Sequence, residues 1–242
     1  MRRYVRTDVI GVVVATVFAC CTAASAASVT GTVSYDGKVP NLKPLSMDAD
    51  PVCKGKHQAP VPSEMLALGS GNTMGNILVR VVSGLPEGKT YPAPKDPVLM
   101  DQNGCIYKPH VLVLQAGQPL KVLNSDGILH NVHALPKVNS QFNIAMPPTR
   151  KEAEHVFDKP EEPFQIKCDV HPWMTAYTMI VTNPFYFVTA EDGKFTISDL
   201  PAGTYEIEAW HEKLGKKTEK VTVGETDAKA VDFKFSPPSG AK

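Results

Sequence analysis

Short runs of β-branched and aliphatic residues, separated by turn residues, dominate the chain from about residue 28 onward. The first two runs are 29–35, which ends at Asp36-Gly37, and 77–82, which ends at Ser83-Gly84. Further runs of this kind lie at 111–114, 120–123, 164–167, 178–182, 194–197, 205–210 and 220–223. Runs of this length between Gly, Pro, Asn and Asp predict strands. Helical periodicity never lasts more than about two turns, so the sequence predicts an all-β chain of the sandwich type.

The first 26 residues have a different character. Three arginines lie within residues 1–6, an apolar run follows from Val9 to Cys21, and small residues fill 22–27. This layout predicts a cleaved signal peptide over 1–26, because the apolar run of about 13 residues is shorter than the ~20 of a membrane-spanning helix. We therefore expect an exported protein, periplasmic or otherwise outside the cytoplasm, with no transmembrane segment after cleavage.

Two alternatives at the N-terminus stay open. Cys20 is a candidate lipidation site, and Arg2-Arg3 is a weak twin-arginine export signal.

Charge and cysteine count narrow the function further. Residues 1–26 hold three Arg and one Asp, so the mature chain keeps 22 basic and 24 acidic side chains, a net charge of −2. This balance gives no reason to expect a nucleic-acid partner. The cysteines that remain are Cys53, Cys105 and Cys168. In an oxidising compartment two of the three can pair, and the third is then a free thiol or a metal ligand.

The most informative stretch of the chain places three potential metal ligands within seven residues. Cys168, His171 and Met174 directly follow the predicted strand 164–167, and a loop this short lets their side chains converge. Thiolate, imidazole and thioether together suit copper, and a trigonal His₂Cys set with a distant axial Met is the blue-copper arrangement. Zinc is the main rival metal, but Met is not among its usual ligands. A second histidine must come from elsewhere in the chain.

His130 and His133 are the natural donors of that second imidazole. They lie between a turn at 124–127 and another at Pro136. Side chains three residues apart in a strand point to opposite faces. If this segment is extended, only one of the two histidines can face the loop that holds Cys168.

Residues 97–183 resemble the small cupredoxins, and those of the amicyanin type most of all. In that family an Asn ends a strand, five residues lead to a ligand His, and Asn-Val-His follows; here Asn124 precedes His130-Asn131-Val132-His133 by the same spacing. The Cys-x-x-His-x-x-Met loop has the family's length, with Pro172 after the histidine and Trp173 before the methionine. Two departures are a segment 161–167 poor in aromatic residues and Ala176 where the family has Gly.

This resemblance implies a Greek-key β-sandwich over 97–183 that binds one copper ion. The implied ligands are His130, Cys168, His171 and Met174, and the residues implied to brace the site by hydrogen bonds are Asn124 and Asn131. It further implies that His171 presents its ring edge at the surface. The apolar residues expected around that edge are Pro172, Trp173 and Leu135.

The segment 185–235 resembles the carboxypeptidase regulatory-like, or transthyretin-like, β-sandwich family. It holds a DGxF turn at 192–195 followed by LPxGxY at 200–205, and the opening strand of the family pattern has a close variant far upstream at 31–40. About 50 residues are too few for a complete sandwich. We therefore expect residues 28–95 to supply the missing strands of this second, smaller sandwich at 184–236, with the middle domain inserted into it. Three consecutive modules are the alternative.

Cys53 and Cys105 are interpreted as a disulfide pair. His57 and His110 lie close to them in the sequence, so a second metal site formed by these four residues is the alternative. The histidines interpreted as surface or structural residues are His133, His155 and His211.

Four protein ligands that fill a copper ion's coordination sphere leave no open position for substrate, which argues against an enzyme of the Lewis-acid kind. The sequence thus predicts a mononuclear, type 1 copper protein that carries single electrons between redox proteins that dock transiently. The alternative from another class is a scaffolding or carbohydrate-binding protein whose copper is stored or structural. A third possibility is an enzyme subunit. It requires a second metal ion at the cluster of Cys53, His57, Cys105 and His110.

Overall fold

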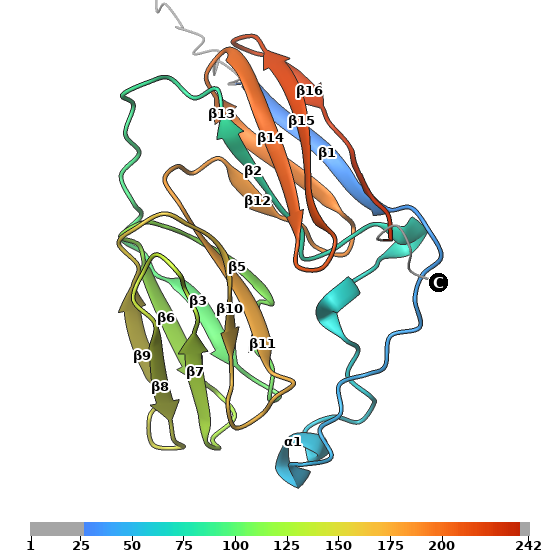
Figure 1. The fold of residues 1–242 in the computed structure, drawn as a ribbon, viewed down its shortest axis with the longest axis vertical. Coiled ribbons are helices and arrows are strands. Elements are labelled where there is room, and N and C mark those ends of the chain that lie inside the picture. The colour runs from blue at the N-terminus through green and yellow to red at the C-terminus, as the bar shows by residue number, and fades with distance from the viewer. Residues whose placement is uncertain (1–26, 238–242) are drawn as a thin grey trace, which may run out of the picture.

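The computed structural model describes residues 27–237 of the 242-residue chain. The predicted signal peptide, with its candidate lipidation and twin-arginine sites, lies outside the described residues. Within 27–237, no helix is long and apolar enough to cross a membrane. The prediction of an all-β chain is confirmed, because the described residues fold into two β-sandwiches with few and short helices (Figure 1).

The inner sandwich consists of strands that pair only with one another. These are β3 (Val98–Gln102), β4 (Tyr107–Lys108), β5 (Val111–Gln115), β6 (Pro119–Asn124), β7 (His130–Ala134), β8 (Phe142–Met146), β9 (Glu152–Val156), β10 (Glu161–Lys167) and β11 (Thr175–Val181). One sheet has the order β5-β11-β10-β7-β8 and the other β4-β3-β6-β9. The pairs β5–β11 and β3–β6 are parallel, and the remaining pairs are antiparallel.

Alternation of side chains explains where the inner core lies. In β6, Leu120 and Val122 are buried while Lys121 between them is not, as expected for a strand with one face on a core. Strand β5 is buried along its whole length, since Leu112 and Leu114 face the inner core while Val111 and Val113 face the outer sandwich. This strand therefore connects the two sandwiches.

The outer sandwich combines strands from both ends of the described chain. Its strands are β1 (Ala27–Tyr35), β2 (Leu78–Ser83), β12 (Tyr186–Val188), β13 (Lys194–Leu200), β14 (Gly203–His211), β15 (Gly215–Val223), β16 (Ala228–Ala230) and β17 (Phe233–Phe235). One sheet has the order β13-β1-β16, with β17 also pairing with β1, and the other has the order β12-β2-β14-β15. Residues 184–236 alone therefore form no complete sandwich, because β1 and β2 contribute to both of its sheets. In the sequence, the inner sandwich lies between β2 and β12.

Polar contacts also join the two sandwiches. Arg80 of β2 binds Glu208 of β14 at 2.8 Å and Glu162 of β10 at 2.7 Å. Lys216 of β15 contacts the same two carboxylates. The interface thus combines an apolar cluster with a small network of ion pairs, which favours one relative arrangement of the two sandwiches.

Between β1 and β2 the chain forms a long excursion, residues 36–77, which we call the arm. It holds the helix α1 (Pro51–Gly55) and the 3₁₀ helices η1 (Glu64–Leu66) and η2 (Ser70–Asn72). Figure 1 shows the arm running from the outer sandwich down beside the inner one, with α1 at its far end. Of residues 28–95, β1 and β2 belong to the sheets of the outer sandwich, and Met74 and Ile77 of the arm are buried in its core.

The arm is attached to the inner sandwich at α1. Cys53 forms a disulfide with Cys105, and both cysteines, together with Met47, belong to the inner core. Helix α1 begins at Pro51 because Asp50 caps it: its Oδ1 accepts from the N–H groups of Val52 (2.8 Å) and Cys53 (3.1 Å). The cap and the disulfide together fix Asp50 near the end of the inner sandwich.

Candidate metal centre

Three of the four predicted ligands come together at one end of the inner sandwich. His130 is the first residue of β7, Cys168 directly follows β10, and His171 lies in the hairpin loop before β11. The loop is closed by backbone hydrogen bonds from Cys168 N–H to Met174 O (3.2 Å) and from Met174 N–H to His171 O (2.9 Å). The side chains of His130, Cys168 and His171 are buried, with at most 2% of each residue exposed.

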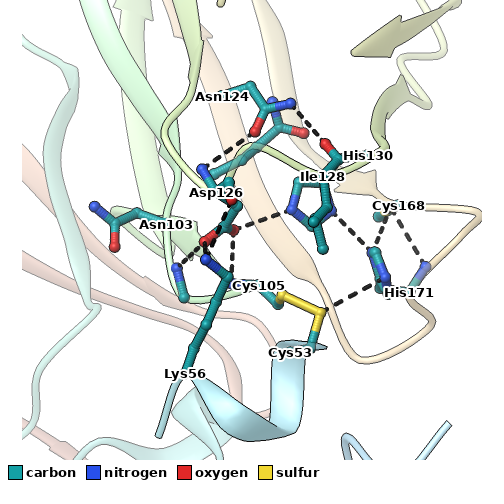
Figure 2. A network of polar contacts seen from close by, with 12 residues as sticks. Cys53, Lys56, Asn103, Cys105, Asn124, Asp126, Ile128, His130, Cys168 and His171 are labelled. Atoms are coloured by element: carbon teal, nitrogen blue, oxygen red, sulfur yellow. Dashed lines mark hydrogen bonds and ion pairs between the residues drawn. A yellow bond between two sulfur atoms is a disulfide. The ribbon is translucent and has the colours of Figure 1, made fainter. Parts of the chain in front are cut away.

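The ligand atoms of these three residues face one another (Figure 2). The two Nδ1 atoms, of His130 and His171, lie 2.9 Å apart, and Cys168 Sγ lies 3.7 Å from His171 Nδ1. One donor atom from each residue lies within 4.8 Å of the others, which is close enough for a single ion to bind all three. The fourth predicted ligand, Met174, is fully buried in the inner core beside them; the role of its thioether stays a prediction.

Each imidazole has a carboxylate at its outer nitrogen. His130 Nε2 lies 3.0 Å from Asp126 Oδ2, and His171 Nε2 lies 3.1 Å from Asp50 Oδ2. Burial alone would raise the pKa of Asp126, but hydrogen bonds from His130 and from the backbone N–H groups of Cys105 and Gly104 hold this pKa well below its usual range. The Cys53 N–H and the His171 ring lower the pKa of Asp50 in the same way. Both carboxylates are therefore ionised at neutral pH.

The ionised carboxylates determine which ring nitrogens can bind a metal. A carboxylate only accepts hydrogen bonds, so the Nε2 atom of each histidine must donate and the Nδ1 atom of each neutral ring carries a lone pair. Two lone pairs that face each other at 2.9 Å repel unless a cation lies between them. Either a shared proton or a metal ion satisfies this arrangement, so the donor set fits a bound cation.

Cys168 is prepared to act as a thiolate. Burial raises the pKa of this thiol, but hydrogen bonding with His130 and with backbone N–H groups, including that of His171 at 3.4 Å, outweighs burial and lowers it. A thiolate is the form of cysteine that binds metals. The centre thus offers two imidazole nitrogens and one cysteine sulfur in a buried space.

Both predicted bracing residues belong to this hydrogen-bond network. Asn131 Oδ1 accepts from the Asp169 N–H (2.7 Å) and lies 3.3 Å from Cys168 Sγ. Asn124 Nδ2 donates to Ile128 O and Met146 O, and its Oδ1 accepts from the Asp126 N–H. Asn131 therefore fixes the start of the cysteine loop. Asn124 fixes the turn that presents Asp126.

One expectation about the site is wrong: His171 does not present a ring edge at the surface. The arm covers it, because Asp50 binds its Nε2 and the disulfide sulfur of Cys53 lies 3.6 Å from the same atom. Trp173 packs beside the ring, at 5.1 Å between centroids, and donates from Nε1 to Cys105 O. Of the apolar residues expected around an open edge, Pro172 is exposed, whereas Trp173 and Leu135 are partly buried.

Two residues of the centre were missed at the sequence level. Asp126 lies in a turn, where Asp is expected for its local hydrogen bonding, so it carried no separate signal. Asp50 followed by Pro51 is a recognisable helix start, with an N-cap and Pro at the first helical position. That signal could have located α1 in the sequence. It could not have shown that Asp50 contacts His171, which is 121 residues further along the chain.

The remaining histidines do not form a second centre in the part of the chain that the structure describes. His57 Nε2 lies 2.7 Å from Gly104 O, and His110 Nε2 lies 2.8 Å from Glu212 Oε1. Neither belongs to a group of side chains spaced for a metal ion among residues 27–237. His133 points away from the centre, as expected for a strand position three residues from His130, and binds Asp169 at 2.9 Å.

No protein-family model and no curated protein matches the chain. Among solved structures it is similar to a copper-containing nitrite reductase from Thermus scotoductus, at 18% identity and a TM-score of 0.33, covering 40% of this chain and 25% of that one. A purple cupredoxin from Nitrosopumilus maritimus matches at 21% identity and a TM-score of 0.29, covering 35% of this chain and 99% of that one. A Cu(I) amicyanin variant matches at 15% identity and a TM-score of 0.32, covering 42% of this chain and 97% of that one.

Proposed function

We propose that the chain is a mononuclear copper protein that carries single electrons between redox proteins. The observation that carries this proposal is the convergence of two imidazole Nδ1 atoms and one thiol, all buried, within 4.8 Å of one another. A His₂Cys set of this kind, with a weak axial donor, is the ligand set of electron-transferring copper sites. Met174 is the proposed axial donor.

The residues of the chain have separate tasks in this function. His130, Cys168 and His171 hold the ion, while Asp126 and Asp50 keep the two imidazoles in the tautomer that leaves Nδ1 free. A copper ion in this place supplies a one-electron couple between Cu(II) and Cu(I). Burial of all three ligands excludes water, which favours electron transfer over a reaction that needs substrate at the metal.

Copper is favoured over zinc by the whole donor set. Structural zinc sites are built from Cys and His in a closed tetrahedral group, and the fourth residue beside this centre is a methionine. Thioether sulfur is a soft donor that suits copper. The alternative of a second metal site, which an enzyme subunit would need, has no group of side chains spaced for an ion at His57 or His110 among residues 27–237. We propose a single copper per chain, and an electron carrier rather than an enzyme.

Export of the protein is part of this proposal. The Cys53–Cys105 disulfide supports it, since disulfides of this structural kind form and persist in oxidising compartments. The proposed location is the periplasm or another extracytoplasmic compartment, where the proposed partners are redox proteins that dock briefly.

The alternative function is copper storage or scaffolding, in which the outer sandwich attaches to a carbohydrate or a larger complex. Closure of the centre by the arm is compatible with both functions, so the behaviour of the reduced protein distinguishes them. An electron carrier keeps its copper through repeated reduction and oxidation, as judged by metal content after each cycle. A storage protein loses copper on reduction.

Replacing Met174 with leucine tests the proposed axial donor. Leucine nearly conserves volume and apolarity, so the cost in stability should stay below about 1.5 kcal/mol. Loss of the thioether should favour the reduced ion by on the order of tenfold, which for one electron raises the reduction potential by about 59 mV. Redox titration of the copper-loaded variant measures this shift. A lowered potential, or a protein that no longer binds copper, would show that Met174 has a different role.

A further inference from the structure

Asp50 contacts the copper centre from outside the sandwich that builds it. Its two carboxylate oxygens have different tasks: Oδ1 caps α1, and Oδ2 accepts from Nε2 of His171 at 3.1 Å. The side chain is 30% exposed, whereas Asp126, at the other histidine, is 2% exposed. The two histidines therefore have matching hydrogen bonds that come from different parts of the chain.

Charge and geometry at Asp50 act on His171 together. A carboxylate that accepts from the outer nitrogen fixes the ring orientation and makes the inner nitrogen a stronger donor. A stronger donor and a nearby negative charge both favour the more highly charged, oxidised ion. Since the Cys53–Cys105 disulfide anchors α1, Asp50 cannot move away from the ring without unwinding the start of the helix.

We propose that Asp50 is a positioning residue for the copper centre: it holds His171 with Nδ1 facing inward and stabilises the oxidised ion, so the arm sets the reduction potential. This inference rests on the proposed copper function. Among residues 27–237, no carboxylate other than Asp50 is within hydrogen-bonding distance of His171 Nε2. Neither sandwich therefore supplies this contact.

The Asp50→Asn substitution removes the negative charge of this side chain and should leave the fold unchanged. Asn is as good an N-cap as Asp, so α1 and the disulfide should form as before. The neutral amide should shift the oxidised-to-reduced equilibrium by at least about tenfold toward the reduced ion, which is about 59 mV for one electron.

Asp48→Asn is the matched control, two residues away on the same arm. Asp48 pairs with Lys54 at 2.7 Å, and both side chains are largely exposed, at 71% and 68%. Removal of an exposed, screened charge should leave the potential close to that of the wild type. Equal shifts in Asp50→Asn and Asp48→Asn, or no shift in either, would overturn the inference.

A second measurement needs no copper. In the metal-free protein, the Nε2–H proton of His171 should exchange slowly with solvent in the wild type and in Asp48→Asn, as seen by NMR of the imidazole N–H groups. It should exchange fast in Asp50→Asn, and protection that persists there would contradict a positioning role.

Failure of this inference is distinguishable from failure of the proposed function. In the first case the wild type still shows a reversible copper couple, and in the second it shows none.

Discussion

Replacing Cys168 with serine should abolish the intense visible absorption of the oxidised, copper-loaded protein and leave the chain folded. The absorption expected of this ligand set arises from charge transfer between a thiolate and Cu(II), and a serine hydroxyl gives no such transition. Folding should persist because serine is slightly smaller than cysteine and its hydroxyl can donate to Asn131 Oδ1, which lies 3.3 Å from the present sulfur. Absorption and circular dichroism spectra measure colour and fold separately.

His133→Gln is the control for this experiment. His133 belongs to the same strand as His130 but points away from the centre, where it binds Asp169. The copper-loaded control should keep its colour. Colour that survives in Cys168→Ser, or disappears in His133→Gln, would mean that the ligands are misassigned.

Removing the disulfide should produce the largest loss of stability. The cross-link joins residues 52 positions apart, and native disulfides typically contribute about 2–5 kcal/mol to the free energy of unfolding. In the double variant Cys53→Ala with Cys105→Ala we therefore expect a loss in this range, as measured by denaturant unfolding. The variant should also expose His171, since the arm is no longer covalently held over this residue. A chelator should therefore remove copper faster from the variant than from the wild type.

Thiol labelling provides the control for the double variant. The unfolded, metal-free mature wild type should show one reactive cysteine without reductant, Cys168, and the double variant should show the same one. Unchanged stability and an unchanged rate of copper removal would show that the arm is held by its other contacts, which include Met47 in the inner core and Leu45 packed against it.

Strands that appear as apolar runs between turn residues were predictable from the sequence, including the fully buried β5, but β8 and β9 were not predicted. β1, β6 and β14 have apolar residues at regular intervals between turn residues, so the local pattern indicates them. β9 was missed because it buries only Ala153, and three of its other residues, Glu152, Glu154 and His155, are polar. Its pairing with β6 depends on backbone hydrogen bonds, which the pattern of side chains does not indicate.

The residue pattern alone predicted the candidate site only where its residues are close in the sequence, and the family resemblance added His130, Asn124 and Asn131. The spacing of Cys168, His171 and Met174 is local, and the opposite faces of a strand leave a choice between His130 and His133. The cover over His171 depends on a contact with Asp50, far away in the chain, and on a disulfide that positions α1. Pattern alone cannot specify such contacts, so the expectation of an exposed histidine failed.

The most direct test of the account is a redox titration of the copper-loaded wild type, followed by visible absorption and metal analysis. We predict one copper per chain and an intense absorption that disappears on addition of one electron equivalent and returns on oxidation, with the metal retained throughout. Copper that binds without this absorption, or that leaves the protein on reduction, would contradict the account.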